Sequence, residues 1–156
     1  MRILLTRITN DRHSLTVVRD DGSSDLVVLE TRSCFVHDLL HYAVESSAGL
    51  QEGFWGTLAK GTTLAEVNDR TGDFAMGNPN TAMIELAAAV LSGALKGRTA
   101  AELVAGLRGY LEATGKALPP WFTEALVADV QERMRRLLGH WKATAFGQAM
   151  ELEWKV

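Results

Sequence analysis

The sequence predicts an α+β fold in which a small antiparallel sheet packs against a bundle of about four to five helices. The first thirty residues contain three short aliphatic runs, and the last seven alternate between apolar and charged residues. The middle of the chain instead repeats apolar residues every three or four positions, as amphipathic helices do. Because both ends predict strands, we expect the last strand to pair with the N-terminal strands in one sheet.

Length and composition are those of one folded domain spanning residues 1–156. Of the 156 residues, 47% are hydrophobic and 22% are charged, which is ordinary for a globular protein. A chain of this length can enclose a core of its own and is short for two domains. We therefore expect a single α+β domain.

The N-terminal strands are expected over residues 1–9, 13–19 and 25–30. Leu15 and Val17 recur at the two-residue period of a half-buried strand. Between the second and third runs, the segment Asp20-Asp21-Gly22-Ser23 contains the Asp-Gly pair that favours a tight hairpin turn. These features predict an antiparallel meander.

Helices are expected from residue 33 onward. Ser33 can cap a helix that runs to about residue 47, and Gly49 suits a left-handed helix end. Residues 54–60 form a short apolar segment between two glycines. Residues 69–80 are rich in Gly, Asn and Asp, and we expect a loop there.

Three further helices are predicted in the second half of the chain. Residues 83–95 are apolar on almost all sides, which predicts a central helix buried by its neighbours. Thr99 and Glu102 have the spacing of a capping box at a helix start. Pro119-Pro120 is expected to open the last long helix, over residues 121–140.

Charge, cysteine content and hydropathy exclude several classes of partner. The net charge of −3 gives no electrostatic reason to expect a nucleic acid. Cys34 is the only cysteine, so the chain can form no internal disulfide and no thiolate metal cage. The longest nearly uncharged stretch, residues 82–95, is shorter than the roughly 20 residues that cross a bilayer. We expect a cytoplasmic protein without a membrane partner.

The segment His37-Asp38-Leu39-Leu40-His41, followed by Glu45, is the most informative feature of the sequence. At about 100° per residue, His41, Glu45 and Asp38 lie within about 100° of His37 on a helical wheel. Apolar side chains fill the remaining arc. All ionisable groups of this helix therefore lie on one narrow strip, which could face a cleft.

This strip carries the side-chain types that bind a divalent metal ion. Imidazoles four residues apart on a helix can reach one ion, so we consider His37 and His41 as ligands and Glu45 as the third. Asp38 is then either a general base or a residue that orients an imidazole. Zinc is the first candidate, and iron, manganese or nickel are the others.

The motif resembles two known patterns in part. It is similar to the His-Glu-x-x-His signature of zinc peptidases at His37 and His41, but Asp38 stands where those enzymes have the glutamate base. It also resembles the His-Asp-x-x-His motif of a helical family of ubiquinone-biosynthesis proteins, with Glu52 near the position of that family's downstream glutamate. The predicted strands do not fit the all-helical fold of that family. Neither resemblance assigns the chain to a family.

Two other residues enter the site hypothesis as pocket residues. Glu85 is the lone charge in an apolar run, so its carboxylate needs a partner. That partner is either the free N–H groups at the start of its own helix or the His37/His41 strip. Trp55 lies between glycines, and we interpret it either as the wall of a ligand pocket or as a core residue at a tight corner.

Two functions remain open from the sequence. The first is a small divalent-metal-binding protein, hydrolase-like in its ligand set, that uses the His-Asp-x-x-His helix. The second is a non-catalytic binding or assembly module, for example a homodimer, in which the polar strip is only solvated and no metal is bound. The substrate or ligand, and whether the protein is an enzyme, do not follow from the residues.

Overall fold

Four strands form one antiparallel sheet, in the order β3-β2-β1-β4, with helices packed on it. The computed structural model describes residues 1–67 and 78–156 of the chain. The strands are β1 (Arg2–Arg7), β2 (Arg12–Val18), β3 (Ser24–Glu30) and β4 (Ala149–Glu153). The predicted α+β class is confirmed.

The first and last strands of the described chain are neighbours in the sheet. The β2–β3 hairpin turns at Gly22, whose φ of +87° is the left-handed conformation that the Asp-Gly pair predicts. Strand β4 pairs with β1 in antiparallel register, and Ile3 stands opposite Leu152. Alternate side chains of β1, Ile3 and Leu5, are fully buried toward the helices. The expected pairing of the last strand with the meander is therefore confirmed.

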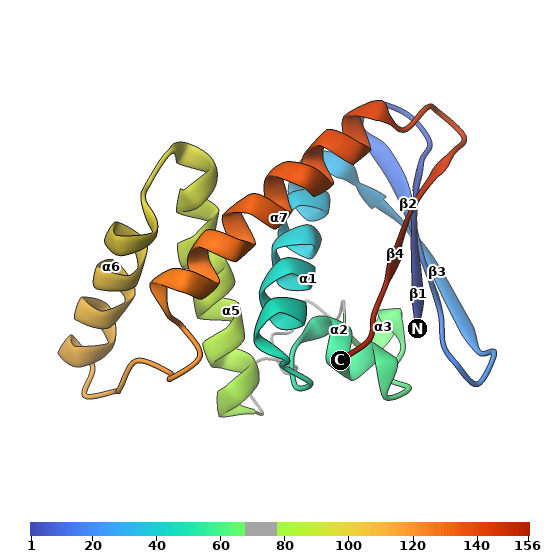
Figure 1. The fold of residues 1–156 in the computed structure, drawn as a ribbon. Coiled ribbons are helices and arrows are strands. Elements are labelled where there is room, and N and C mark those ends of the chain that lie inside the picture. The colour runs from blue at the N-terminus through green and yellow to red at the C-terminus, as the bar shows by residue number, and fades with distance from the viewer. Residues whose placement is uncertain (68–77) are drawn as a thin grey trace.

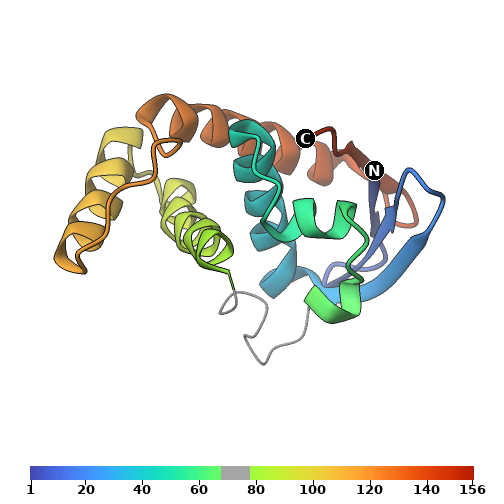
Figure 2. The same ribbon diagram turned by 90° about the horizontal axis from the view of Figure 1, so that it is seen from below.

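The helices form two further layers on one side of the sheet. Figure 1 shows α1 and α7 next to the sheet, and α5 and α6 farther away, while α2 and α3 lie near the end of the sheet where both termini are found. In Figure 2 the same arrangement is seen from below. The helices are α1 (Val36–Ala48), α2 (Phe54–Ala59), α3 (Leu64–Val67), α5 (Pro79–Leu91), α6 (Ala100–Ala113) and α7 (Glu124–Ala143).

The start of α1 differs from the prediction. A π-helical turn, η1 (Thr31–Phe35), leads directly into α1, and no side chain caps the helix. Ser33, the expected cap, donates its hydroxyl to Glu30 at 2.9 Å. The continuous helical backbone from η1 provides the carbonyl partners that a cap would otherwise replace. The other end agrees with prediction, since Gly49 has a φ of +68°.

The later helices agree with the sequence in part. Thr99 and Glu102 form the predicted capping box of α6. Helix α5 begins at Pro79 and ends at Leu91, where a 3₁₀ turn, η2 (Ser92–Lys96), takes over, so the helix begins and ends four residues earlier than expected. Helix α7 begins after its cap Thr123 and not at the proline pair.

Most of the loop that we predicted over residues 69–80 lies outside the described residues. At its end, the side chain of Asn78 caps α5 by accepting from the N–H of Asn80 at 2.9 Å. Pro79 occupies the first turn, where the N–H that proline lacks has no helical partner to lose.

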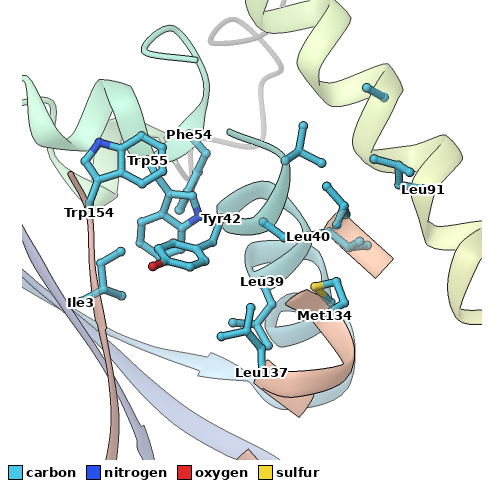
Figure 3. Packing of buried hydrophobic residues seen from close by; sticks show 14 of the residues in the cluster. Ile3, Leu39, Leu40, Tyr42, Phe54, Trp55, Leu91, Met134, Leu137 and Trp154 are labelled. Atoms are coloured by element: carbon cyan, nitrogen blue, oxygen red, sulfur yellow. The ribbon is translucent and has the colours of Figure 1, made fainter. Parts of the chain in front are cut away.

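The core lies between the sheet and the α1/α7 layer, and α1 runs through it (Figure 3). Trp55 of α2 is fully buried and donates its indole N–H to the carbonyl of Asp38 at 3.0 Å. Tyr42 donates its hydroxyl to the carbonyl of Glu153 at 3.0 Å. These two bonds attach α1 to α2 and to β4, which fixes how the polar strip of α1 is turned.

None of the helices in the described part of the chain combines the length and apolar character needed to cross a membrane.

Candidate metal centre

Helices α1 and α5 bring two imidazoles and one carboxylate to a common point. Nε2 of His41 lies 3.3 Å from Oε2 of Glu85, and Nε2 of His37 lies 3.7 Å from the same oxygen. The two rings are one turn apart on α1, with centroids separated by 4.6 Å. Among the residues that the structure describes, this is the one group of His, Cys, Asp or Glu compact enough to hold an ion. We refer to His37, His41 and Glu85 as the histidine–glutamate cluster.

The distances in the cluster suit a metal ion. Ligand atoms placed tetrahedrally at about 2.0–2.1 Å from zinc stand about 3.3–3.4 Å apart. The two nitrogen–oxygen distances are close to that value, and all three ligand atoms lie within 4.8 Å of one another. His41 is buried, whereas the side chain of His37 is 53% exposed. The cluster therefore reaches the surface of the protein on the side of His37.

Glu45 is fully buried on the other side of His41. Its Oε1 lies 3.0 Å from Nδ1 of His41 and accepts the N–H of Phe54 at 2.9 Å. Its Oε2 accepts the N–H groups of Trp55 and Gly56 at 3.0 and 3.2 Å. The carboxylate therefore satisfies the free N–H groups at the start of α2. Glu45, the predicted third metal ligand, therefore lies outside the compact group of possible ligands, which contains Glu85 instead.

The approach of Glu45 to α2 depends on a glycine. A Cβ atom on Gly53, the residue before α2, would collide with the Glu45 carboxylate. The sequence showed this glycine as one of a pair around an aromatic dipeptide, but the pattern alone does not reveal a carboxylate behind it. Because the burial of Glu45 depends on how α2 folds back onto α1, no sequence signal indicates this cap.

The contact with Glu45 also defines the tautomer of His41. A carboxylate accepts and does not donate, so Nδ1 of His41 carries the proton in this contact. Nε2 is then the nitrogen that faces Glu85. It is buried, and its contacts do not have the geometry of a hydrogen bond. A carboxylate on one imidazole nitrogen and an ion on the other is the usual arrangement around metal-binding histidines.

Asp38 stands in a similar relation to His37. Its Oδ1 lies 3.6 Å from Nδ1 of His37, which is slightly longer than a hydrogen bond, so the interaction is mainly electrostatic. Nε2 of the same ring faces Glu85. Asp38 is therefore on the side of His37 that faces away from the cluster. This position supports the orienting role, and the role of general base at an ion stays a prediction.

Without a metal, the carboxylates favour protonated imidazoles. Asp38 and Glu85 raise the pKa of His37 to about 10. Burial lowers the pKa of His41, but Glu45 and Glu85 outweigh it and raise the value to about 9. Burial raises the pKa of Glu85, but the two histidines outweigh this effect and lower the value to about 2. Protons and a metal ion therefore compete for the same nitrogen atoms.

The remaining residues singled out in the sequence lie apart from the cluster. Trp55 is a core residue, edge-on to Tyr42 with ring centroids 6.2 Å apart. Glu52 is exposed and accepts from the side-chain amide of Asn80. Glu85 lies beyond the first turn of α5, so it does not cap its own helix. Its carboxylate instead faces the histidines, which was the other partner considered from the sequence.

The polar strip of α1 is thus divided by its neighbours into a part that faces α5 and a part that faces α2. Comparison with known proteins adds no family to this description, because no protein-family model, no curated protein and no solved structure matches the chain.

Proposed function

We propose that the protein binds one divalent metal ion, zinc first, through Nε2 of His37, Nε2 of His41 and a carboxylate oxygen of Glu85. The observation that carries the proposal is the convergence of both nitrogens on one oxygen, at 3.7 and 3.3 Å. Two histidines and one glutamate are a common ligand set for zinc, and iron, manganese and nickel also accept imidazole.

The surroundings of the ligands support the same proposal. Each imidazole has a carboxylate near its Nδ1 atom, Asp38 for His37 and Glu45 for His41. Such carboxylates hold the ring in place and increase the electron density at the ligating nitrogen. With three protein ligands, the fourth position would belong to water or to a small ligand.

Metal binding is proposed here without a hydrolytic reaction. An open fourth position is shared with hydrolytic zinc enzymes, whose bound water needs a general base within reach. Asp38, the residue suggested for that task, lies near Nδ1 of His37 and not near the Nε2 atom that faces Glu85. The geometry therefore favours an orienting role for Asp38 within the metal centre.

The test is elemental analysis of protein purified without a histidine tag. We expect near-stoichiometric metal in the wild type, and its loss in His37→Ala/His41→Ala and in Glu85→Gln. Glu52→Gln is the matched control, since Glu52 is an exposed glutamate outside the cluster. Zinc titration of the metal-stripped protein should raise the unfolding temperature of the wild type and of the control only. A wild type that stays metal-free and is not stabilised by these ions contradicts the proposal.

A second candidate is the assembly module, which the edge strand of the sheet favours. Leu26 and Val28 of β3 are 66% and 47% exposed, and they alternate along the strand with less exposed residues. Exposed apolar side chains on an edge strand are a common place for chains to associate. A wild-type dimer in sedimentation experiments that becomes monomeric in Leu26→Lys would support this candidate, and a monomeric wild type would reject it.

A further inference from the structure

His13 of β2 is a fully buried histidine outside the histidine–glutamate cluster. Its ring packs edge-on against Phe35 and Trp141, with centroid distances of 5.4 and 6.1 Å. Nδ1 lies 3.2 Å from Oγ1 of Thr31, but Nε2 is buried without a hydrogen-bond partner. Because an unpaired buried nitrogen is costly and rare, a core position alone does not explain a histidine here.

A complementary unpaired atom belongs to Asp38. Its Oδ2 is also buried without a hydrogen-bond partner, while Oδ1 faces His37. Asp38 follows Phe35 by three residues, so the two side chains leave the helix on neighbouring positions, and Phe35 contacts His13. Burial lowers the pKa of His13, and the nearby charge of Asp38 opposes this effect. His13 and Asp38 therefore each have one buried polar atom without a hydrogen-bond partner, a nitrogen that can donate and an oxygen that can accept.

The π-helical turn η1 is arranged around the same histidine. Thr31, its first residue, meets Nδ1 of His13, and Phe35, its last residue, packs on the ring. Turns of this type are rare and are often found at functional sites. Here the turn leads directly into α1 and therefore determines where the first turn of α1, which contains Asp38, is placed.

One tautomer of His13 would suit both Thr31 and a carboxylate acceptor. A neutral imidazole donates from one nitrogen and accepts at the other. If Nδ1 accepts the hydroxyl proton of Thr31, Nε2 carries a proton that a carboxylate can accept. In the opposite tautomer Nε2 is an acceptor, as the unpaired Asp38 oxygen is, so neither atom could serve as a partner for the other.

We propose that His13 is a positioning residue of the metal centre: its Nε2–H group donates to Asp38, and Asp38 in turn holds His37 through Nδ1. This inference rests on the proposed function, because it gives His13 a role only through a ligand of the ion. A rotation of Asp38 or one bridging water would complete the contact, and the order from donor to acceptor would be the same in both.

The first test needs no metal and no variant. Long-range proton–nitrogen correlation spectra of the metal-free wild type at neutral pH report which nitrogen of His13 carries the proton. We expect the Nε2–H tautomer, and in Asp38→Leu a shift toward Nδ1–H, since Thr31 can then accept. A wild type with the Nδ1–H tautomer overturns the inference.

The second test compares zinc affinities, measured by competition with a chromophoric chelator. His13→Met fills the space without a donor, whereas the amide of His13→Gln can replace Nε2–H. We expect a loss on the order of tenfold in His13→Met and of less than about threefold in His13→Gln, as for residues that hold a ligand histidine. Unchanged affinity in folded His13→Met overturns the inference.

Two further readouts separate positioning from a packing effect. In the Asp38→Leu background, His13→Met should cause no additional loss of zinc affinity, because the two residues act in series. The visible spectrum of the cobalt-substituted protein should change in His13→Met and be restored in His13→Gln. Additive losses, or a spectrum that does not change, would contradict the role.

The two tests also distinguish the failure of this inference from that of the proposed function. Wild-type protein that binds no zinc but has the Nε2–H tautomer contradicts metal binding and leaves the contact between His13 and Asp38 in place. Zinc binding together with the Nδ1–H tautomer contradicts the role of His13 alone.

Discussion

His41 and Glu45 lie one turn apart on α1, and their side chains meet at 3.0 Å between Nδ1 and Oε1, both buried. The same carboxylate accepts three N–H groups of α2. It therefore joins two structures that are distant in the sequence, the start of α2 and the histidine–glutamate cluster. A substitution at the start of α2 should therefore affect the cluster, and a substitution in the cluster should affect α2.

Replacing Glu45 should destabilise the fold. Glu45→Gln keeps one carbonyl oxygen for the N–H groups of α2 but turns the second acceptor into a donor and removes the charge next to His41. We expect a loss of about 3 kcal/mol in the free energy of unfolding of the metal-free protein, as for one broken buried pair. Urea denaturation measures it. Glu151→Gln, an exposed residue of β4, is the control and should change little; equal losses in both variants would contradict the role of Glu45.

Two glycine substitutions should change the stability of the protein in opposite directions. Gly53→Ala places a Cβ atom against the Glu45 carboxylate and should cost about 1–3 kcal/mol of stability through steric overlap. Gly109→Ala in α6 meets nothing within 4 Å and should stabilise the helix by about 0.5–1 kcal/mol. Thermal unfolding of both variants gives the comparison. A neutral Gly53→Ala would mean that Glu45 does not occupy the position described.

The stability of the metal-free protein should depend on pH through the cluster. The pKa values of His37 and His41 rise from 6.5 to about 10 and about 9, so their contribution is full below 6.5 and is lost as the pH rises through those values. The pKa of Glu85 falls from 4.5 to about 2, so its contribution is present above 4.5 and is lost as the pH falls toward 2.

We therefore expect a plateau between about pH 4.5 and 6.5 and a decline on either side. Urea denaturation across this range tests the expectation. In Glu85→Gln the alkaline decline should become smaller, because one of the carboxylates that raise both histidine pKa values is then neutral. An identical profile for this variant and the wild type would argue against the described contacts.

Zinc binding should release protons at neutral pH. Both imidazoles are protonated there in the metal-free protein, and each must lose a proton to ligate. The apparent affinity should therefore increase with pH up to the region of these pKa values. Calorimetry in buffers of different ionisation enthalpy counts the released protons. Binding without proton release would show that the imidazoles are not the ligands.

The capping box of α6 provides a prediction that is independent of the cluster. Oγ1 of Thr99 accepts from the N–H of Glu102 at 3.3 Å, and Oε2 of Glu102 accepts from the N–H of Thr99 at 2.8 Å. Thr99→Ala should cost about 1 kcal/mol of stability, whereas Thr99→Ser keeps the hydroxyl and should cost little. Thermal unfolding of both variants measures the two losses of stability, and equal losses would contradict the role of the Thr99 hydroxyl.

The sequence alone determined the features that depend on local geometry. The strands at both ends, the turn at Gly22, the cap at Thr99 and the alignment of His37 with His41 all follow from periods and turn residues within a few positions. For these features each residue contacts neighbours whose separation along the chain is fixed by the backbone geometry of a helix or hairpin.

Only the tertiary structure decided which carboxylate joins the histidines. Glu45 satisfies the helical spacing as well as any ligand would, but the start of α2 folds back onto it and its oxygens accept from backbone N–H groups. Glu85 is distant in sequence and reaches the cluster because α5 packs beside α1 with that face inward. The rotation of one packed helix relative to another depends on side chains from several elements at once, and no period within a single segment records it.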